Sequence, residues 1–285
     1  MSIINKFYVV GDPIEQSFSP TIHNTVFKYL NLPYHYDRKL VNEENIDSFV
    51  KLAKRDKQIY GFSVTHPNKQ LILPFIDELG EMARVIGAAN CVAVRNGLLF
   101  GYNTDGNGYI KSIMRTGFDF NGAKVKIIGA GGAARSIIYS LLQVNIASLT
   151  IYNRSLPKAV QIASEFGGKA NVQRLEDFSP IHCDLLINAT SVGMQPHISD
   201  CPVDNLDGIL PDTFVSDIIY SPERTKFLQM AEAKGCAVEN GLKMLILQAL
   251  ISEEIWFERN DLANNEELIE LIEEEVKKEI KAKLL

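Results

Sequence analysis

The chain has 285 residues, 46% of them hydrophobic, and a formal net charge of −6. Its length allows one large domain or two of ordinary size, and its apolar content suffices for packed cores. The negative charge argues against a nucleic-acid binder driven by phosphate contacts. An anionic ligand would therefore have to be met by local lysine, arginine or helix-terminus charge.

The first hundred residues alternate between strand-like and helix-like segments. The pattern predicts short strands at 7–10, 34–40, 61–64 and 98–102, and helices at 21–30 and 46–54. A glycine- and Asx-rich segment, residues 103–108, follows and precedes a helix that runs to about Thr116 and is capped by Gly117. We therefore place a domain boundary here, with residues 1–104 forming an α/β domain.

The second part of the chain has a different order of elements. Strands are predicted at 125–128, 149–152, 184–188 and 214–218, and helices at 133–143 and 157–166. This order is typical of βαβ units and predicts a Rossmann-type sheet over residues 105–240. Residues 241–285 are helical, and we expect them to complete the first domain.

The tail carries the pattern of a long amphipathic helix. Its apolar stripe is Leu268, Ile272, Val276, Ile280 and Leu284, and its charge pairs are Glu273/Lys277, Glu274/Lys278 and Glu279/Lys283. Packing on its own subunit is the favoured interpretation, and contact with a second subunit is the alternative. Both a monomer and a homodimer are compatible with the sequence.

The cysteines and the N-terminal residues indicate the protein's setting. Cys91, Cys183, Cys201 and Cys236 lie far apart and lack metal-ligand spacing, so we expect reduced, structural thiols and no metal. The first residues carry no basic leader and no long apolar stretch. These features favour a cytoplasmic protein without membrane or nucleic-acid partners.

A glycine-rich turn joins the strand at 125–128 to the helix that follows. The turn consists of Gly129, Ala130, Gly131, Gly132 and Ala133. Glycines there allow a pyrophosphate to approach the backbone, and the helix N-terminus supplies unpaired N–H groups.

The next strand decides between the two nicotinamide cofactors. It ends in Asn153, Arg154 and Ser155, where an NAD site would carry an acidic residue for the ribose hydroxyls. The arginine suits a 2′-phosphate, so the sequence favours NADP over NAD.

Three polar clusters in the first 105 residues are candidates for substrate contacts. In the first, Pro20 fits the first helical position and Ser19 its N-cap. Capping explains Ser19 without a ligand but does not explain Ser17. A helix N-terminus flanked by two hydroxyls could alternatively receive a carboxylate.

The second cluster follows the strand that ends at Thr65. Pro67 fits the start of a helix, which places Lys69 in its first turn, where the positive end of the helix dipole disfavours a cation. Acid–base catalysis can exploit such a position, although a solvated surface lysine is the ordinary alternative. His66 is interpreted as structural or surface-exposed.

The third cluster lies at the predicted boundary. Turn formation is the ordinary explanation for Asn103 and Asp105. Alternatively, Asp105 faces Lys69 and holds a substrate hydroxyl, while Asn90 hydrogen-bonds a polyhydroxylated ligand.

In this order, the motifs resemble those of the shikimate dehydrogenase family. Besides the glycine turn and the Asn153 segment, they are Ser17 with Ser19, V-T-x-P-x-K at 64–69, residues 87–90, 101–106, 188–194, Asp217 with Tyr220, and 241–248. The resemblance implies reversible, NADPH-dependent reduction of 3-dehydroshikimate to shikimate, with a substrate domain beside a Rossmann-type NADP domain.

The resemblance also assigns residues to the two ligands. It implies that Lys69 and Asp105 are the catalytic pair and that Ser17 and Ser19 bind the substrate carboxylate. Further substrate contacts would be Ser63, Thr65, Asn90, Tyr220 and Gln248. NADP would contact Gly129, Ala130, Gly131, Gly132, Ala133, Asn153, Arg154, Ser155, Lys158, Thr190, Ser191, Gly193, Met194, Ile218 and Gly241. For Gln248 a satisfied polar residue on a helix face is the alternative.

Two positions depart from the family pattern. Ser63 stands where the family has Asn, and its shorter reach leaves open a quinate/shikimate dehydrogenase with relaxed substrate and cofactor choice. Lys243 stands where Gly is common. A non-catalytic NADP-binding regulatory protein is a further alternative, and the presence of both Lys69 and Asp105 argues against it.

Overall fold

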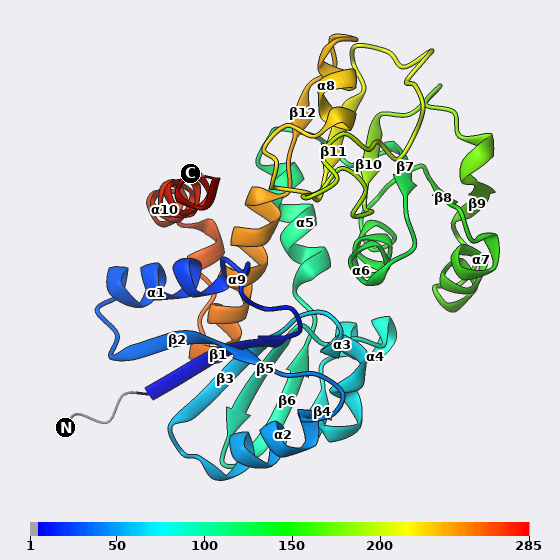
Figure 1. Ribbon diagram of the computed structural model, residues 1–285. Helices are drawn as coiled ribbons and strands as arrows, with labels where there is room; N and C mark the ends of the chain where they lie inside the picture. The colour runs from blue at the N-terminus through cyan, green and yellow to red at the C-terminus, as the bar shows by residue number, and fades with distance from the viewer. Residues whose placement is uncertain (1–4, 285) are drawn as a thin grey trace. The chain divides into compact units, whose positions relative to one another are not determined.

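The structure, a computed structural model that describes residues 5–284, divides into two compact units (Figure 1). The first unit comprises the chain up to Gly108 together with Ile246 onward, and the second spans Tyr109–Leu245. Both divisions fall inside helices, namely α5 (Asp105–Met114) and α9 (Leu242–Phe257). Each of these helices therefore contributes residues to both units.

The first unit is built on a six-stranded sheet of order β2-β1-β3-β5-β6-β4. The strands are β1 (Asn5–Gly11), β2 (Tyr34–Leu40), β3 (Ile59–Val64), β4 (Glu78–Leu79), β5 (Cys91–Arg95) and β6 (Leu98–Tyr102). β5 runs antiparallel to β3 and β6, and the other pairs are parallel. The four strand predictions are confirmed. β4 and β5 were not predicted, because such short strands carry little periodicity.

Helices pack against this sheet through two separate apolar clusters. The helices are α1 (Ser19–Tyr29), α2 (Ile46–Arg55), α3 (Asn68–Leu71), α4 (Glu81–Ile86) and α10 (Glu266–Leu284), with short 3-10 turns at Leu73–Phe75 and Leu262–Asn264. Phe49 of α2 lies in one cluster with Phe62 of β3. Phe7 of β1 lies in the other with Phe27 of α1, and Trp256 of α9 packs against it. Alternate residues of the strands thus supply both cores.

A buried polar pair lies between α1 and α9. Nδ1 of His23 lies 2.6 Å from Oε1 of Glu253, and both side chains are almost completely buried, at 1% and 0% exposed. Burial lowers the pKa of His23 to about 3 and raises the pKa of Glu253 well above its usual value. Both shifts favour the neutral forms of the two groups.

Helix α10 packs against α1, beside which it lies in Figure 1. Leu268, Ile272 and Val276 are fully buried, as the apolar stripe predicted, whereas Ile280 is half-buried and the side chain of Leu284 lies outside the described residues. The predicted packing on its own chain is therefore confirmed.

The predicted charge pairs of α10 are confirmed in two cases and wrong in the third. Glu273 pairs with Lys277 and Glu279 with Lys283. Lys278 instead pairs with Glu275 at 2.7 Å. The position three residues away is also a neighbour on the helix surface, so Lys278 has two carboxylates within reach.

The second unit contains a six-stranded sheet of order β12-β11-β10-β7-β8-β9, with all strand pairs parallel. The strands are β7 (Lys124–Ile128), β8 (Ser148–Asn153), β9 (Asn171–Arg174), β10 (Leu185–Asn188), β11 (Phe214–Asp217) and β12 (Val238–Glu239). The helices are α6 (Gly132–Leu141), α7 (Leu156–Glu165) and α8 (Lys226–Glu232), with a 3-10 turn at Leu175–Asp177. The predicted Rossmann-type sheet is confirmed. From β7 successive strands are added on one side of the sheet, and from β10 on the other. Sheets of this type bind ligands at such a reversal, beyond the carboxyl ends of the strands.

Helix α5 begins earlier than the sequence predicted. The glycine- and Asx-rich segment was expected to precede the helix, but the helix starts at Asp105 and includes Gly108. A Cβ atom at Gly108 would lie 2.7 Å from the backbone nitrogen of Gln248 on α9. The glycine therefore reflects close packing of two helices and does not end a helix.

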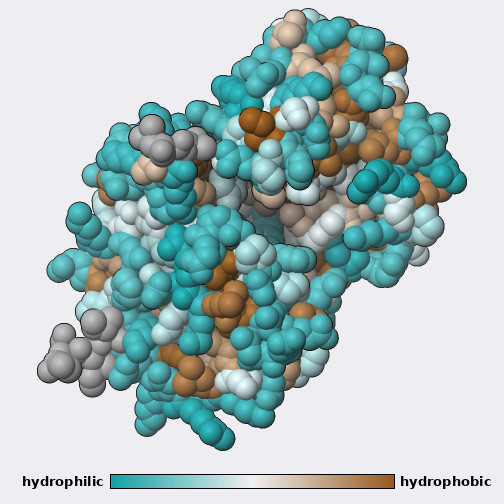
Figure 2. All heavy atoms as spheres, in the orientation of Figure 1, coloured by the Kyte–Doolittle hydropathy of each residue, from teal (hydrophilic) through white to brown (hydrophobic). Residues whose placement is uncertain are grey.

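The surface shown in Figure 2 is mostly hydrophilic, with hydrophobic residues in small separate groups. Within residues 5–284, no helix is long and apolar enough to cross a membrane.

Candidate active site

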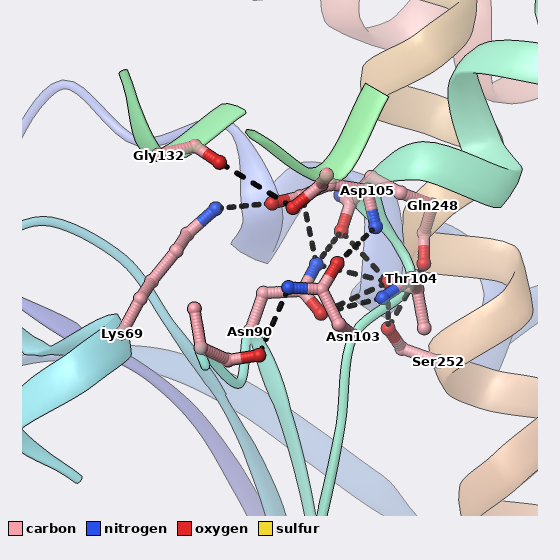
Figure 3. A network of polar contacts seen from close by, with 10 residues as sticks. Lys69, Asn90, Asn103, Thr104, Asp105, Gly132, Gln248 and Ser252 are labelled. Atoms are coloured by element: carbon pink, nitrogen blue, oxygen red, sulfur yellow. Dashed lines mark hydrogen bonds and ion pairs between the residues drawn. The ribbon is translucent and has the colours of Figure 1, made fainter. Parts of the chain in front are cut away.

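Lys69 and Asp105 form an ion pair in the first unit (Figure 3). Nζ of Lys69 lies 2.6 Å from Oδ2 of Asp105. The side chain of Lys69 is 26% exposed and that of Asp105 only 8%, so the carboxylate is buried while the ammonium can reach a ligand. The structure thus contains the contact that the sequence left as one of two interpretations for Asp105.

Asn90 holds the other oxygen of this carboxylate. Its Nδ2 atom donates to Oδ1 of Asp105 at 2.7 Å and lies 3.2 Å from Oε1 of Gln248. Its Oδ1 atom accepts the backbone N–H of Thr104 at 2.8 Å. Asn90 is 3% exposed, so these contacts fix its orientation and that of Asp105.

Two members of this network were missed in the sequence. Oγ1 of Thr104 lies 2.9 Å from Nδ2 of Asn90 and 3.2 Å from Oγ of Ser252. Thr104 stands between Asn103 and Asp105, which were both considered as candidates for substrate contacts. Ser252 lies one helical turn after Gln248 on α9. The i, i+4 spacing was the available signal for Ser252, since it places both side chains on one face.

The helix that carries Lys69 is shorter than the dipole argument assumed. α3 has only four residues, and Pro67 is its N-cap residue instead of its first helical residue. So short a helix has little macrodipole, because the dipole grows by summing aligned peptide units. The immediate electrostatic partner of Lys69 is the carboxylate of Asp105.

The turn before α1 also differs from the prediction. Phe18 is the N-cap residue and Ser19 is the first helical residue, so the prediction of Ser19 as N-cap is wrong. The hydroxyl of Ser17 accepts the backbone N–H of Ser19 at 3.3 Å, and Nε of Arg38 donates to the carbonyl of Ser17 at 3.2 Å. Ser17 thus satisfies one free N–H at the helix terminus.

The remaining substrate candidates lie in different parts of the chain. Ser63 lies near the end of β3, and Thr65 is the first residue after this strand. Both side chains are half-buried. Tyr220 belongs to the second unit, after β11, and burial raises its pKa. Gln248 belongs to the first unit, with its side chain in the Asn90 network.

The glycine turn after β7 has the geometry of a pyrophosphate cradle. Gly129 has φ +117°, and a Cβ there would lie 3.0 Å from the carbonyl oxygen of Ala189. Gly131 is the N-cap of α6, and a Cβ on Gly131 or Gly132 would meet nothing within 4 Å. The turn thus combines an enforced glycine with open space in front of a helix N-terminus, which fits the diphosphate of a dinucleotide.

The end of β8 carries two exposed cations beside a helix N-terminus. Ser155 is the N-cap of α7, and Arg154 and Lys158 lie exposed around this helix terminus. Asn153 donates to the carbonyl of Ser155 at 2.9 Å, which orders the segment. Among the charged groups that the structure describes, neither Arg154 nor Lys158 has a carboxylate partner. The group of cations at a helix N-terminus fits a 2′-phosphate.

The loop after β10 is held by a buried carboxylate. Asp217 accepts Nδ2 of Asn188 at 3.1 Å and the hydroxyl of Thr225 at 2.8 Å. Asn188 in turn accepts the hydroxyl of Thr190 at 2.7 Å. Burial raises the pKa of Asp217 to about 6. Thr190, Ser191, Gly193 and Met194 follow on this loop.

The cofactor candidates Ile218 and Gly241 contact each other in the second unit. A Cβ at Gly241 would lie only 1.9 Å from the carbonyl oxygen of Ile218, so this position requires glycine. The N–H of Gly241 donates to the carbonyl of Ile219 at 3.0 Å. The segment after β12 is thereby fastened to the one after β11.

Comparisons with known proteins match both units. Residues 9–92 match the shikimate dehydrogenase substrate binding domain, and residues 111–201 match shikimate / quinate 5-dehydrogenase. A shikimate dehydrogenase (NADP(+)) from Caldicellulosiruptor bescii is 37% identical over 267 residues, which cover 92% of this chain and 92% of that protein.

Solved structures are also similar over nearly the full chain. One is shikimate 5-dehydrogenase from Thermus thermophilus in complex with NADP(H) and shikimate, with a TM-score of 0.85, 29% identity, and coverage of 96% of this chain and 99% of that one. Another is the 5-ketofructose reductase of Gluconobacter sp. strain CHM43, with a TM-score of 0.84, 33% identity and the same coverage.

Proposed function

Because the chain belongs to the shikimate dehydrogenase family, we propose that it interconverts 3-dehydroshikimate and shikimate. It is an NADP-dependent oxidoreductase that acts on a CH–OH group. The observation that carries the proposal is the Lys69–Asp105 ion pair, 2.6 Å long and supported by Asn90, in the unit that matches the substrate binding domain.

The first unit would bind the substrate through neutral polar groups. The hydroxyls of Ser17 and Ser19 would receive its carboxylate at the start of α1. The hydroxyls of the substrate would be bound by Ser63, Thr65, Asn90 and Gln248. The hydrogen bonds of the Asn90 network support this role, since they fix the orientation of its donors and acceptors.

Lys69 and Asp105 would handle the proton of the reaction. During reduction, the ammonium of Lys69 stabilises the oxygen that develops negative charge and delivers a proton to it. In the reverse direction the same amine accepts the proton from the hydroxyl. Asp105 orients the lysine and the substrate hydroxyl through a carboxylate whose other oxygen Asn90 holds.

The second unit would hold NADP, which supplies or accepts the hydride when bound. The turn from Gly129 to Ala133 would receive the pyrophosphate, and the Asn153 segment with Lys158 the 2′-phosphate. The nicotinamide end would lie by the segments after β10, β11 and β12. These segments carry the cofactor candidates Thr190, Ser191, Gly193, Met194, Ile218 and Gly241. The segment after β11 also carries Tyr220, which we propose as a substrate contact.

Steady-state rates with two substrates and two cofactors test this function. We expect the highest kcat/KM for shikimate with NADP, and lower values for quinate and for NAD. Absence of NADP-dependent oxidation of shikimate by the folded protein would contradict the proposal. Comparable rates with quinate would instead favour the relaxed enzyme that Ser63 left open.

We also propose a cytoplasmic enzyme that is a monomer or a homodimer. All four cysteines are free, in keeping with a reducing compartment. Sedimentation of the purified protein would separate the two oligomeric states.

A further inference from the structure

Helix α10 reaches the turn at the start of α1 that consists of Ser17, Phe18 and Ser19, here called the serine turn. Nζ of Lys283 lies 4.3 Å from the ring centroid of Phe18, the residue between Ser17 and Ser19. Phe18 is 6% exposed, so the lysine covers a ring that is otherwise buried. The contact has cation–π geometry and holds a positive charge beside the turn.

Glu279, one turn earlier on α10, ties this lysine to the same region. It pairs with Lys283 at 2.8 Å and lies 3.5 Å from Nη2 of Arg38, and it accepts the hydroxyl of Thr21 in the first turn of α1. Arg38 also donates to the carbonyl of Ser17. Two cations thus contact the turn itself, and the carboxylate of Glu279 joins them to the first turn of α1.

This arrangement matters because the serine hydroxyls are neutral and the chain as a whole carries a net charge of −6. A substrate carboxylate approaching the turn gains from any local positive charge. The carboxylate of Glu279 is shared by two cations, which leaves one positive charge in excess. Lys283 is 40% exposed, so its field reaches solvent and is open to screening by salt.

We propose that Lys283, held in place by Glu279, raises the affinity of the enzyme for the carboxylate of its substrate. The inference rests on the proposed function, because it assumes that Ser17 and Ser19 receive that carboxylate. Lys283 takes no part in the chemistry, since Lys69 and Asp105 handle the proton. It adds to α10 a role in substrate binding beyond its packing on α1.

The experiment compares substitutions at two lysines of the same helix. Lys283→Met removes the charge and keeps an unbranched side chain, whereas Lys283→Arg keeps the charge. Lys278→Met is the matched control, because Lys278 is 65% exposed and pairs with Glu275, away from the serine turn. Steady-state kinetics with shikimate and NADP, and thermal unfolding, are measured for all four proteins.

We expect Lys283→Met to raise the KM for shikimate about three- to tenfold, with kcat within about twofold of the wild type. The KM for NADP should not change, and Lys283→Arg and Lys278→Met should resemble the wild type. The KM of the wild type should rise with NaCl until it meets that of Lys283→Met, because salt screens the charge. A merely structural role would not produce this convergence.

The outcomes separate the two proposals. If the wild type oxidises shikimate and Lys283→Met has the same KM as Lys278→Met, the role of Lys283 is refuted and the proposed function stands. The role of Lys283 is also refuted if Lys283→Met and Lys283→Arg raise the KM for shikimate equally and NaCl does not change the KM of the wild type. If the folded wild type does not oxidise shikimate, the proposed function itself fails.

Discussion

At the scale of single residues, the environment of each charged group indicates its role. Lys69 shares a buried carboxylate with an oriented amide, and Arg154 lies exposed at a helix N-terminus. The first arrangement suits the proton donor that we propose, and the second suits the proposed contact with an anionic ligand. The residue types alone do not distinguish these two uses of a positive charge.

Replacing Lys69 tests the catalytic pair. Lys69→Ala should lower kcat by about 10²- to 10⁴-fold and change the KM for shikimate little, because it removes the proton donor and leaves the other contacts. Steady-state kinetics measure both constants. Lys54→Ala is the control, since Lys54 also pairs with an aspartate, Asp77, at 2.7 Å in the same unit. Nearly unchanged turnover in Lys69→Ala would end the assignment.

Replacing Arg154 tests cofactor choice. Arg154→Ala should raise the KM for NADP about tenfold or more and leave the KM for NAD within about twofold, since only NADP loses a charge-assisted contact. Lys234→Ala serves as control, because Lys234 is an exposed cation of the same unit that pairs with Asp207. Equal changes for both cofactors would show that Arg154 does not contact the 2′-phosphate.

At the scale of elements, the buried His23–Glu253 pair links α1 to α9 and makes stability depend on pH. The pKa of His23 falls from 6.5 to about 3 on folding, so stability from this residue is lost as pH falls below 6.5. The pKa of Glu253 rises well above 4.5, so stability from this residue is lost as pH rises above 4.5. Between pH 4.5 and pH 6.5 the two changes in the free energy of unfolding have opposite signs and cancel. Above pH 6.5 only the decrease caused by Glu253 remains.

The substitution Glu253→Gln should therefore remove the decrease in stability that Glu253 causes as the pH rises. The free energy of unfolding of the wild type should decrease relative to that of Glu253→Gln by about 1 kcal/mol per pH unit above pH 6.5, until the pH reaches the raised pKa of Glu253 in the folded protein. Urea unfolding of both proteins between about pH 6.5 and 9 measures the difference. Parallel curves over this range would mean that the folded pair gives up its proton as readily as the unfolded chain does.

At the scale of the whole molecule, most of the proposed substrate and cofactor residues fall in different units. The substrate candidates apart from Tyr220 lie in the first unit, and all the cofactor candidates lie in the second. Each unit has its own six-stranded sheet and its own apolar clusters. Ligand binding should therefore protect one unit more than the other.

Hydrogen exchange with single ligands tests this division. Saturating NADP should slow exchange mainly around Gly129–Ala133 and residues 153–158, and shikimate mainly around Ser17–Ser19 and Lys69, because bound ligand suppresses local opening. Exchange followed by peptide mass spectrometry measures both patterns. Protection by NADP confined to the first unit would contradict the assignment.

Local patterns predicted most of the elements, and several of the differences from the structure lie at element and unit boundaries. Ser19 was expected as an N-cap because its residue type and the following proline fit, but the helix includes it. The domain boundaries were expected at 105, in the segment before a predicted helix, and at 241, whereas the units divide inside α5 and α9. No local pattern indicates where a continuous helix passes from one unit to another.

Short stretches of chain were enough to predict the βαβ order of the second unit and NADP as the cofactor, because strand periodicity, the glycine turn and the residues that follow the second strand are local patterns. The polar groups around Asp105, and the contact of Lys283 with Phe18, are visible only in the folded chain. Thr104 and Ser252, for example, are 148 residues apart along the chain. Such contacts depend on how sheets and helices pack, which no single segment encodes.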